Sequence, residues 1–379
     1  MKKIFLSICL LSLVSFSISA YDFGGVLNNN TQFVSNDKAG AVVIQSNAAY
    51  LWLQSKLSDD LLFSSEVMYK YKLNANKDYS TFENIFDIDL LKLTGSSYFG
   101  NGNLDFSVGR FMVSDITGSV FAQISDGLLL KYGTKKINLS LYTGYTGLLN
   151  AHNVSLVNKD GTVDNIKNDF YSLCKPFIPV SLGVSLQQLF LQQSISLFAD
   201  MFIDASAEKD NRFYATLALD GPLAQGFYYD FSTTFASYTF KELALYSKVK
   251  IHMFITESLY ASAGFEYASG NNGSLKPFRT FSSRPVVSAY ETIETSGIML
   301  PSLSLSGNFG DIYANLDAKF LLDCAEASTT VWGPEVVASI VYNLFYDVQF
   351  GLDGSAFWDV KNDGNLSNYS ATLKINVAF

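Results

Sequence analysis

Charged side chains in this sequence recur at alternate positions, opposite apolar ones. In "YSKVKIHMF", Lys248 and Lys250 alternate with Val249 and Ile251. An extended strand turns successive side chains to opposite faces, so each such segment has one charged face and one apolar face. Charges set around a water-filled passage would bias which ions and solutes pass through it. The inward-facing candidates for such a passage are Glu66, Lys70, Lys72, Asp87, Asp89, Arg212, Asp230, Lys248, Lys250, Glu266, Asp317, Lys319, Asp347, Asp353 and Lys374.

Catalytic or cofactor chemistry has little support in the sequence. The chain has two histidines, His152 and His252, and neither forms a recognisable set with a serine and an acid. Closely spaced His or Cys ligands for a metal are missing as well. We therefore expect no enzyme, cofactor or metal site. The formal net charge of −9 also argues against nucleic acid as a partner, because phosphate binding needs a basic surface.

The alternation points to a fold class. Mean hydropathy is +0.16 and 48% of residues are hydrophobic, yet beyond residue 20 no run approaches the ~20 apolar residues of a membrane-spanning helix. A β-sandwich would also alternate, with its apolar face packed on a second sheet. A hairpin series running the whole chain favours instead a closed antiparallel transmembrane β-barrel, whose backbone groups are all paired internally.

Eighteen strands are predicted, with short turns and longer linkers alternating between them. Segments near 84–112 break strict alternation, so a bulge or a miscount there leaves sixteen as the alternative. An even count puts both termini at the periplasmic end and the long loops outside. The predicted strands are 23–34, 41–57, 61–73, 84–96, 103–112, 126–132, 137–147, 178–190, 193–205, 211–220, 225–238, 241–255, 258–268, 297–307, 311–323, 331–342, 345–357 and 369–379.

The N-terminus reads as a secretion signal. Lys2 and Lys3 precede the apolar run "IFLSICLLSLVSF", and "SISA" follows it. We expect residues 1–20 to be a signal peptide cleaved after Ala20, with a cut after Ser19 as the alternative. Residues 21–379 would then form the barrel.

The signal, the hairpin pattern and the last strand "YSATLKINVAF" together resemble the outer-membrane porin family of Gram-negative-type bacteria. The resemblance implies a location among outer-membrane lipids and recognition of the C-terminal Phe379 by the barrel assembly machinery. It implies passive diffusion of small hydrophilic solutes and ions through a water-filled channel. Trimers are common in the family, so a homotrimer is one of the oligomeric states left open.

Two long loops could narrow such a channel. One is the stretch of about 28 residues from 150 to 177, a length that is unusual without a role. The other carries a basic cluster followed by two acids, an arrangement suited to orienting dipolar or anionic solutes: Lys276, Arg279, Arg284, Glu291 and Glu294. Both loops could equally cover the outer mouth without entering the channel.

Cys174 and Cys324 lie in or beside two of the predicted outer loops. The exported compartment is oxidising, so a disulfide between them is one prediction, and too great a separation is the alternative.

Two other functions stay open at this stage. A transporter of hydrophobic solutes would need an N-terminal plug, for which only Tyr21 to about Lys38 is available. A surface adhesin or structural barrel would depend on its outer loops rather than on its bore. Conductance in a planar bilayer would separate these classes.

Overall fold

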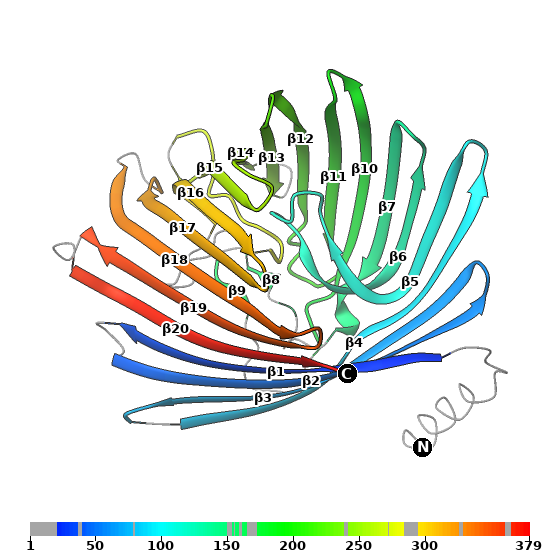
Figure 1. Ribbon diagram of the computed structural model, residues 1–379. Helices are drawn as coiled ribbons and strands as arrows, with labels where there is room; N and C mark the ends of the chain where they lie inside the picture. The colour runs from blue at the N-terminus through cyan, green and yellow to red at the C-terminus, as the bar shows by residue number, and fades with distance from the viewer. Residues whose placement is uncertain are drawn as a thin grey trace.

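Eighteen strands form one antiparallel sheet that closes on itself (Figure 1). In this computed structural model the described residues are 21–36, 40–78, 80–149, 154, 156–158, 161–164, 173–238, 242–271, 273–283, 295–325, 329–360 and 365–379. The predicted signal peptide lies outside them. The barrel strands are β1 (Tyr21–Asn36), β2 (Gly40–Ser58), β3 (Leu61–Asn76), β4 (Ser80–Phe99), β5 (Gly102–Ser114), β6 (Ala122–Gly133), β7 (Ile137–Tyr145), β10 (Phe177–Phe190), β11 (Gln193–Asp204), β12 (Arg212–Ala224), β13 (Phe227–Tyr238), β14 (Glu242–Phe254), β15 (Leu259–Ala268), β16 (Ile298–Phe309), β17 (Ile312–Asp323), β18 (Thr330–Phe345), β19 (Val348–Asp359) and β20 (Asn365–Ala378).

The first and last strands close the wall. β1 pairs with β2 on one side and with β20 on the other, and Gly25 and Phe379 exchange two backbone hydrogen bonds, at 2.8 and 3.0 Å. A Cβ at Gly25 would lie 2.6 Å from the Phe379 ring, so this position needs glycine. The pairing of β20 with β1 therefore completes the cylinder.

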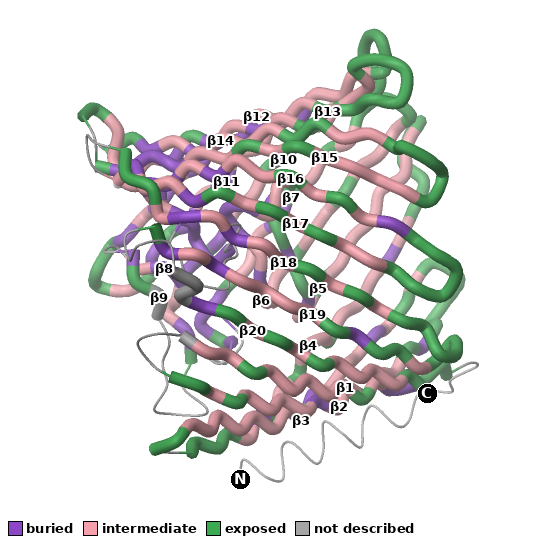
Figure 2. Tube along the Cα trace, turned by 60° about the vertical axis from the view of Figure 1, so that its left-hand side comes forward, coloured by how far each residue is buried: buried purple, intermediate pink, exposed green. Residues whose placement is uncertain are grey.

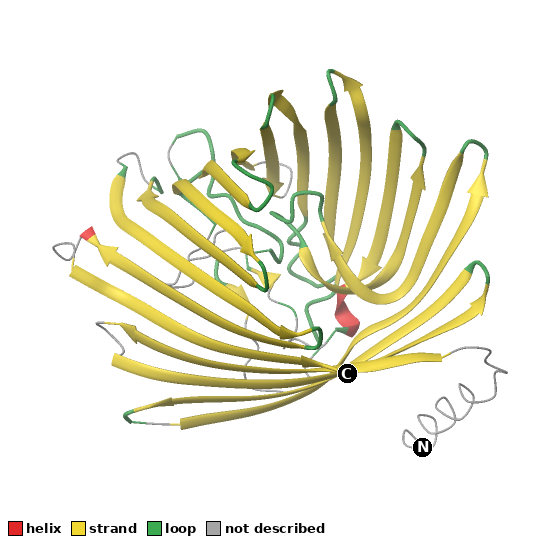
Figure 3. Ribbon diagram, in the orientation of Figure 1, coloured by secondary structure: helices red, strands yellow, loops and turns green. Residues whose placement is uncertain are grey.

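The alternation in the sequence becomes an inside and an outside. On β16, Leu303 and Leu305 are exposed on the outer surface, while Ser302 and Ser304 face inward. The described chain is almost entirely strand (Figure 3). The short η1 (Thr146–Leu148) has three residues, and no helix in the part of the chain that the structure describes is long and apolar enough to cross a membrane.

The region predicted to break the alternation does contain a bulge. The register between β3 and β4 shifts between Glu66 and Val67, which leaves Asp89 as the extra residue. The β4–β5 ladder then runs only from Phe99 to Leu91 on β4. At its end Gly109 has a φ of +121°, and a Cβ there would lie 2.1 Å from the Leu91 carbonyl oxygen. The bulge accounts for the irregular pattern without removing a strand, so the count of eighteen is confirmed and sixteen is wrong.

Connections differ between the two ends of the barrel. Tight turns join β2 to β3, β4 to β5 and β18 to β19 at the end where Phe379 lies. The longer connections are at the other end, where the hairpin β8 (Leu156–Val157) and β9 (Val163–Asp164) also lies. Buried residues gather at this second end (Figure 2). We call it the loop end and the other the turn end.

Candidate channel and its constriction

The predicted inward charges form three groups on the wall. β3 and β4 carry Glu66, Lys70, Lys72, Asp87 and Asp89. β13–β17 carry Asp230, Lys248, Lys250, Glu266, Asp317 and Lys319. β19 and β20 carry Asp353 and Lys374. Arg212 on β12 stands apart from these groups. Asp347 lies in the exposed turn between β18 and β19 rather than on a strand. Its prediction as a wall residue is wrong, since β19 begins at Val348.

The β13–β17 group lines a cavity of about 480 Å³ inside the barrel. Lys250 lies over the Tyr260 ring at 5.4 Å, and His252 Nδ1 lies 3.3 Å from an Asp230 carboxylate oxygen. Tyr246 donates to Glu266 (2.5 Å). Serines from β13, β15 and β16 complete the lining. The cavity therefore offers both signs of charge together with hydroxyl groups.

The β19–β20 group is a cross-strand ion pair. Lys374 pairs with Asp353, and Ser339 on β18 donates to the same carboxylate at 2.7 Å. The Lys374 side chain is 41% exposed and that of Asp353 is 25% exposed. The pair thus remains accessible from within the barrel.

Arg110 on β5 lies where β4 and β5 separate. It forms a two-pronged contact with Asp126 on β6, at 2.8 and 2.9 Å, and donates to the Leu148 carbonyl oxygen at 3.1 Å. Its guanidinium also lies 3.8 Å from Asp87. The arginine therefore ties β4, β6 and η1 together at the point where the β4–β5 ladder stops.

A short segment between β5 and β6 turns into the barrel. In residues 115–121, "DITGSVF", the Asp115 carboxylate accepts hydrogen bonds from the backbone N–H groups of Thr117 (3.0 Å), Val120 (2.9 Å) and Phe121 (2.7 Å). Thr117 Oγ1 also donates to it at 2.6 Å. A carboxylate that accepts several N–H bonds holds a compact loop, because those donors need no other partner. We call residues 115–121 the inner segment.

The inner segment reaches a distant part of the wall. Lys248 Nζ, on β14, donates to Thr117 O (3.0 Å) and Ser119 Oγ (3.2 Å). Ile116 and Thr117 border the cavity formed by β12–β17, and Ile116 also borders a second cavity, of about 590 Å³, against β5–β7. The segment therefore crosses the interior and narrows it.

A second segment packs on the inner segment. The Val120 carbonyl oxygen faces the N–H groups of Phe281 (2.9 Å), Ser282 (3.1 Å) and Ser283 (3.2 Å) from the β15–β16 connection. Ser283 Oγ donates to Gly118 O. Phe281 in turn accepts from the N–H of Val157 on β8, at 2.9 Å. Three connections that are far apart in sequence thus meet inside the barrel (Figure 1).

Aromatic rings fill the space between these connections and the wall. Phe281 stacks on Phe202 of β11 with ring centroids 3.8 Å apart, and Phe121 and Phe177 contact Phe281 at 5.8 and 5.1 Å. Phe278 stacks on Tyr246 at 5.3 Å. Buried aromatic contacts of this kind contribute beyond their area, so this end of the barrel has a packed core.

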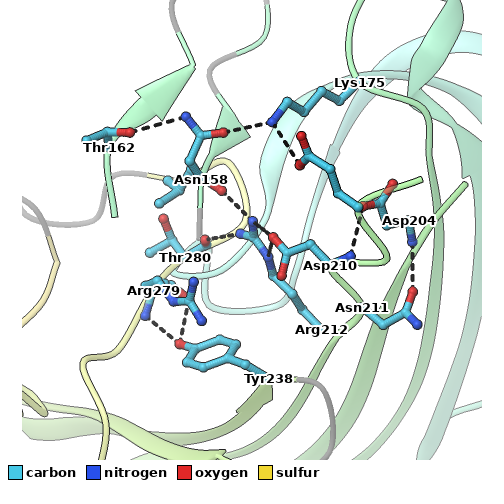
Figure 4. Close-up of polar contacts among 12 residues, drawn as sticks. Asn158, Thr162, Lys175, Asp204, Asp210, Asn211, Arg212, Tyr238, Arg279 and Thr280 are labelled. Carbon is cyan, nitrogen blue, oxygen red and sulfur yellow. Dashed lines mark hydrogen bonds and ion pairs between the residues drawn. The ribbon is translucent and has the colours of Figure 1, made fainter. Parts of the chain in front are cut away.

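Arg212 is the polar centre of that core (Figure 4). It is 2% exposed, pairs with Asp210 and donates to the carbonyl oxygens of Val157 (2.6 Å) and Thr280 (3.2 Å). Arg212 faces inward as predicted, but the connections cover it. It holds two of them to the wall and does not line an open passage.

The predicted basic and acidic loop is described only in part. Arg279 lies over the Tyr238 ring at 4.0 Å, and its N–H donates to Tyr238 Oη at 2.5 Å. The backbone of Lys276 binds that of Leu243. Arg284, Glu291 and Glu294 lie outside the described residues, and so does His152. The described part of this loop does enter the barrel, which is one of the two alternatives left open by the sequence.

The two cysteines are not joined. Cys174 and Cys324 are both buried thiols, so the predicted disulfide is wrong. The backbone N–H of each cysteine bonds to a different segment: that of Cys174 donates to Leu149 O (3.0 Å) and that of Cys324 to Gly297 O (2.7 Å). Burial and the neighbouring Asp323 carboxylate raise the pKa of the Cys324 thiol.

The inner segment was not one of the two loops that the sequence predicted could narrow the channel. The interval 113–125 is shorter than the two loops considered for a constriction. A signal was present, however. Asp115 is followed by Thr117 and Ser119, and such residues bind nearby backbone and favour compact turns.

The fold is similar to that of solved outer-membrane structures. No family model matches the chain, and no curated protein matches it by sequence. Among solved structures, Pseudomonas aeruginosa OccK5 (OpdH) has a TM-score of 0.62 at 12% identity, with 94% of this chain and 98% of that chain covered. OccK11 (OpdR) of the same organism has 0.63 at 11%, covering 95% and 96%. The outer membrane protein OprD from Pseudomonas aeruginosa has 0.59 at 10%, covering 96% and 95%. Over nearly its whole length, the chain therefore has the fold of these Pseudomonas barrels.

Proposed function

We propose that the chain is an outer-membrane porin, a water-filled channel for passive diffusion of small hydrophilic solutes and ions. The observation that carries the proposal is a closed barrel whose interior is crossed by the inner segment. An eighteen-strand wall with an apolar exterior encloses charged side chains, and the inner segment narrows the interior without being part of the wall. Barrels of 16–18 strands are wide enough for an aqueous channel, whereas eight-strand barrels are filled by side chains.

The location follows from the exterior. Large apolar side chains are exposed around the wall, among them Leu197, Leu303 and Leu352 at 55–64%. Such a surface needs hydrocarbon around it. The signal sequence supports export, and the described likeness to OprD, an outer membrane protein, supports the outer membrane as the destination.

Mixed charge in the channel favours weak selectivity. Lysines and carboxylates lie side by side in the β13–β17 cavity, so neither sign dominates there. We expect small polar solutes of either charge to pass, with a mild ion preference.

Single-channel recording tests the proposal. Purified protein reconstituted in a planar bilayer should give stable conductance steps. A folded, inserted barrel that gives no steps would contradict it and would favour a structural barrel. A hydrophobic-solute transporter is less well supported, because Tyr21–Asn36, the residues needed for its plug, form wall strand β1.

Assembly through the C-terminus is part of the same proposal. Phe379 closes β20 against β1 and is 67% exposed in the closed barrel, so it can still contact lipid or another protein there. Removing Phe379 should lower the amount of folded barrel in the outer membrane. A homotrimer is the oligomeric state that the family resemblance favours.

A further inference from the structure

The outward face of most strands is apolar, and a cluster of polar side chains on β1 and β2 departs from this. On β16 and β17 the outward positions from Met299 to Leu322 hold aliphatic and aromatic side chains, glycine or proline, with no amide side chain. On β1 and β2 four polar side chains face outward together: Asn29, Thr31, Gln45 and Asn47. We call these four residues the amide cluster.

The amide cluster lies within the apolar belt of the wall. Leu27 and Phe33, on either side of it along β1, are 48% and 38% exposed on the same face. On β2, Val43 and Leu51 bracket it in the same way, at 43% and 53%. Phe33 also contacts Tyr369 of β20 with ring centroids 6.0 Å apart. The cluster is therefore surrounded by side chains suited to hydrocarbon.

Hydrogen bonds within the cluster use only part of its capacity. Asn29 Nδ2 and Gln45 Nε2 both donate to Asn47 Oδ1, at 2.5 and 3.2 Å, and Thr31 Oγ1 donates to Gln45 Oε1 at 2.6 Å. Each amide group carries two hydrogens and a carbonyl oxygen with two lone pairs. These bonds occupy one hydrogen each of Asn29 and Gln45, so every member of the cluster keeps unused donor or acceptor capacity.

Lipid hydrocarbon offers no hydrogen-bond partner for these unused donors and acceptors. Polar groups without partners in lipid are costly, and membrane proteins place them against protein or water instead. Asn and Gln side chains between membrane segments bind one another and hold the segments together. A fourth amide, Asn84 on β4, faces the same way, beside Tyr69, which donates to it at 2.7 Å. The polar character therefore extends from β1 towards β4.

We propose that the amide cluster is the contact surface for a second copy of this chain. Asn and Gln are self-complementary, since each offers both a donor and an acceptor, so two copies of the same cluster can pair without a different partner sequence. The flanking Leu27, Ala49 and Leu51 would add apolar contact. The inference rests on the proposed membrane location. It deepens the proposal by placing subunit association on β1 and β2.

The test is the number of chains per particle in lipid nanodiscs, measured by mass photometry. Wild-type protein should contain more than one chain. The triple variant Asn29→Leu, Gln45→Leu, Asn47→Leu should weaken association at least tenfold, while the barrel keeps its heat-modifiable gel migration. The matched control is Thr233→Val with Ser247→Ala, which removes an outward-facing polar pair on β13 and β14 (2.8 Å) and should leave association unchanged.

Three results would overturn the inference: a wild-type single chain at every concentration, a wild-type single chain carrying a tightly bound lipid over the cluster, or a triple variant that associates as well as wild type. Conductance of one barrel is a separate readout. A wild-type protein that is a single chain and still gives conductance steps would reject the contact and leave the porin proposal standing.

Discussion

Arg212 and Lys374 are both basic residues on the inward face of a wall strand, but the two regions of the barrel surround them differently. At the loop end, Arg212 is 2% exposed beneath three converging connections. Nearer the turn end, Lys374 pairs with Asp353 and its side chain is 41% exposed. The same alternation in sequence therefore produces a structural centre in one region and an accessible inner wall in the other.

The difference shows what the inward connections do. They convert part of a polar lumen into a core of stacked rings around one satisfied arginine, and they leave the charges elsewhere in contact with the interior space. This packed core lies beside the inner segment, which crosses the interior. A constriction that must keep a fixed size needs such support, because an unsupported loop would move on the timescale of solute passage.

The largest expected effect comes from breaking the loop-end core. Arg212→Ala should destabilise the protein by about 3–5 kcal/mol, because it leaves the Asp210 carboxylate buried without its partner. Urea unfolding followed by gel mobility measures this, and proteolysis of the connections should become faster.

Lys374→Ala is the matched control at the accessible pair. Its cost should be about 0–1 kcal/mol, since water can replace the partner of Asp353. Equal costs for the two variants would contradict the comparison. Asp210→Asn combined with Arg212→Met should cost less than Arg212→Ala alone, because no unpaired charge remains.

The next effect concerns the inner segment. Asp115→Ala removes the carboxylate that accepts from the backbone N–H groups of the inner segment. Each hydrogen bond to a charged group contributes about 1.5–3 kcal/mol to stability. The segment should leave the interior more often, and single-channel conductance should rise, by roughly twofold if the segment sets the narrowest point. Asp105→Ala is the control. It removes an inward carboxylate of β5 that borders the cavity of about 590 Å³ beside Ile116 and that binds Asn103 rather than the inner segment. Unchanged conductance in Asp115→Ala would place the narrowest point elsewhere.

The wall was predictable because its physics is local. Alternation at period two marks each strand wherever lipid lies on one side and water on the other, and all eighteen predicted strands are present, including Tyr21–Asn36. The bulge at Asp89 was detectable as a break in that pattern. Strand ends were less well defined: β4 begins at Ser80 rather than near residue 84.

The interior was less predictable because its contacts are not local. Lys248 and Ser119 are 129 positions apart in sequence, and no periodic pattern links them. Arg212 fits the inward pattern of β12, but only the positions of Val157 and Thr280 show that it is covered. The same holds for the cysteines, whose sequence context suggested a bridge although the structure does not join them.

A smaller effect is expected for the thiol at the loop end. Because burial and Asp323 raise the pKa of Cys324, the reactive thiolate should appear at higher pH than for an unperturbed thiol, whose pKa is about 8.5. In a Cys174→Ser background, alkylation at pH 8 should be about tenfold slower in the folded protein than after denaturation in urea. The rate should climb as pH rises further. Equal rates in both states would show that this region is open to solvent, contrary to the packed core.

The smallest effect should come from a single charge in the accessible lumen. Lys250 is exposed within the β13–β17 cavity, so Lys250→Gln removes one positive charge without releasing the inner segment, which Lys248 binds. The charge balance of the cavity then moves towards its carboxylates, and cation preference should increase. Reversal potentials in a tenfold KCl gradient should shift by a few millivolts, and Ser262→Ala on the same cavity should give no shift. A large shift in reversal potential, or a change in conductance as great as that of Asp115→Ala, would mean that Lys250 lies at the narrowest point. The distinction between a packed loop end and an accessible wall would then be wrong.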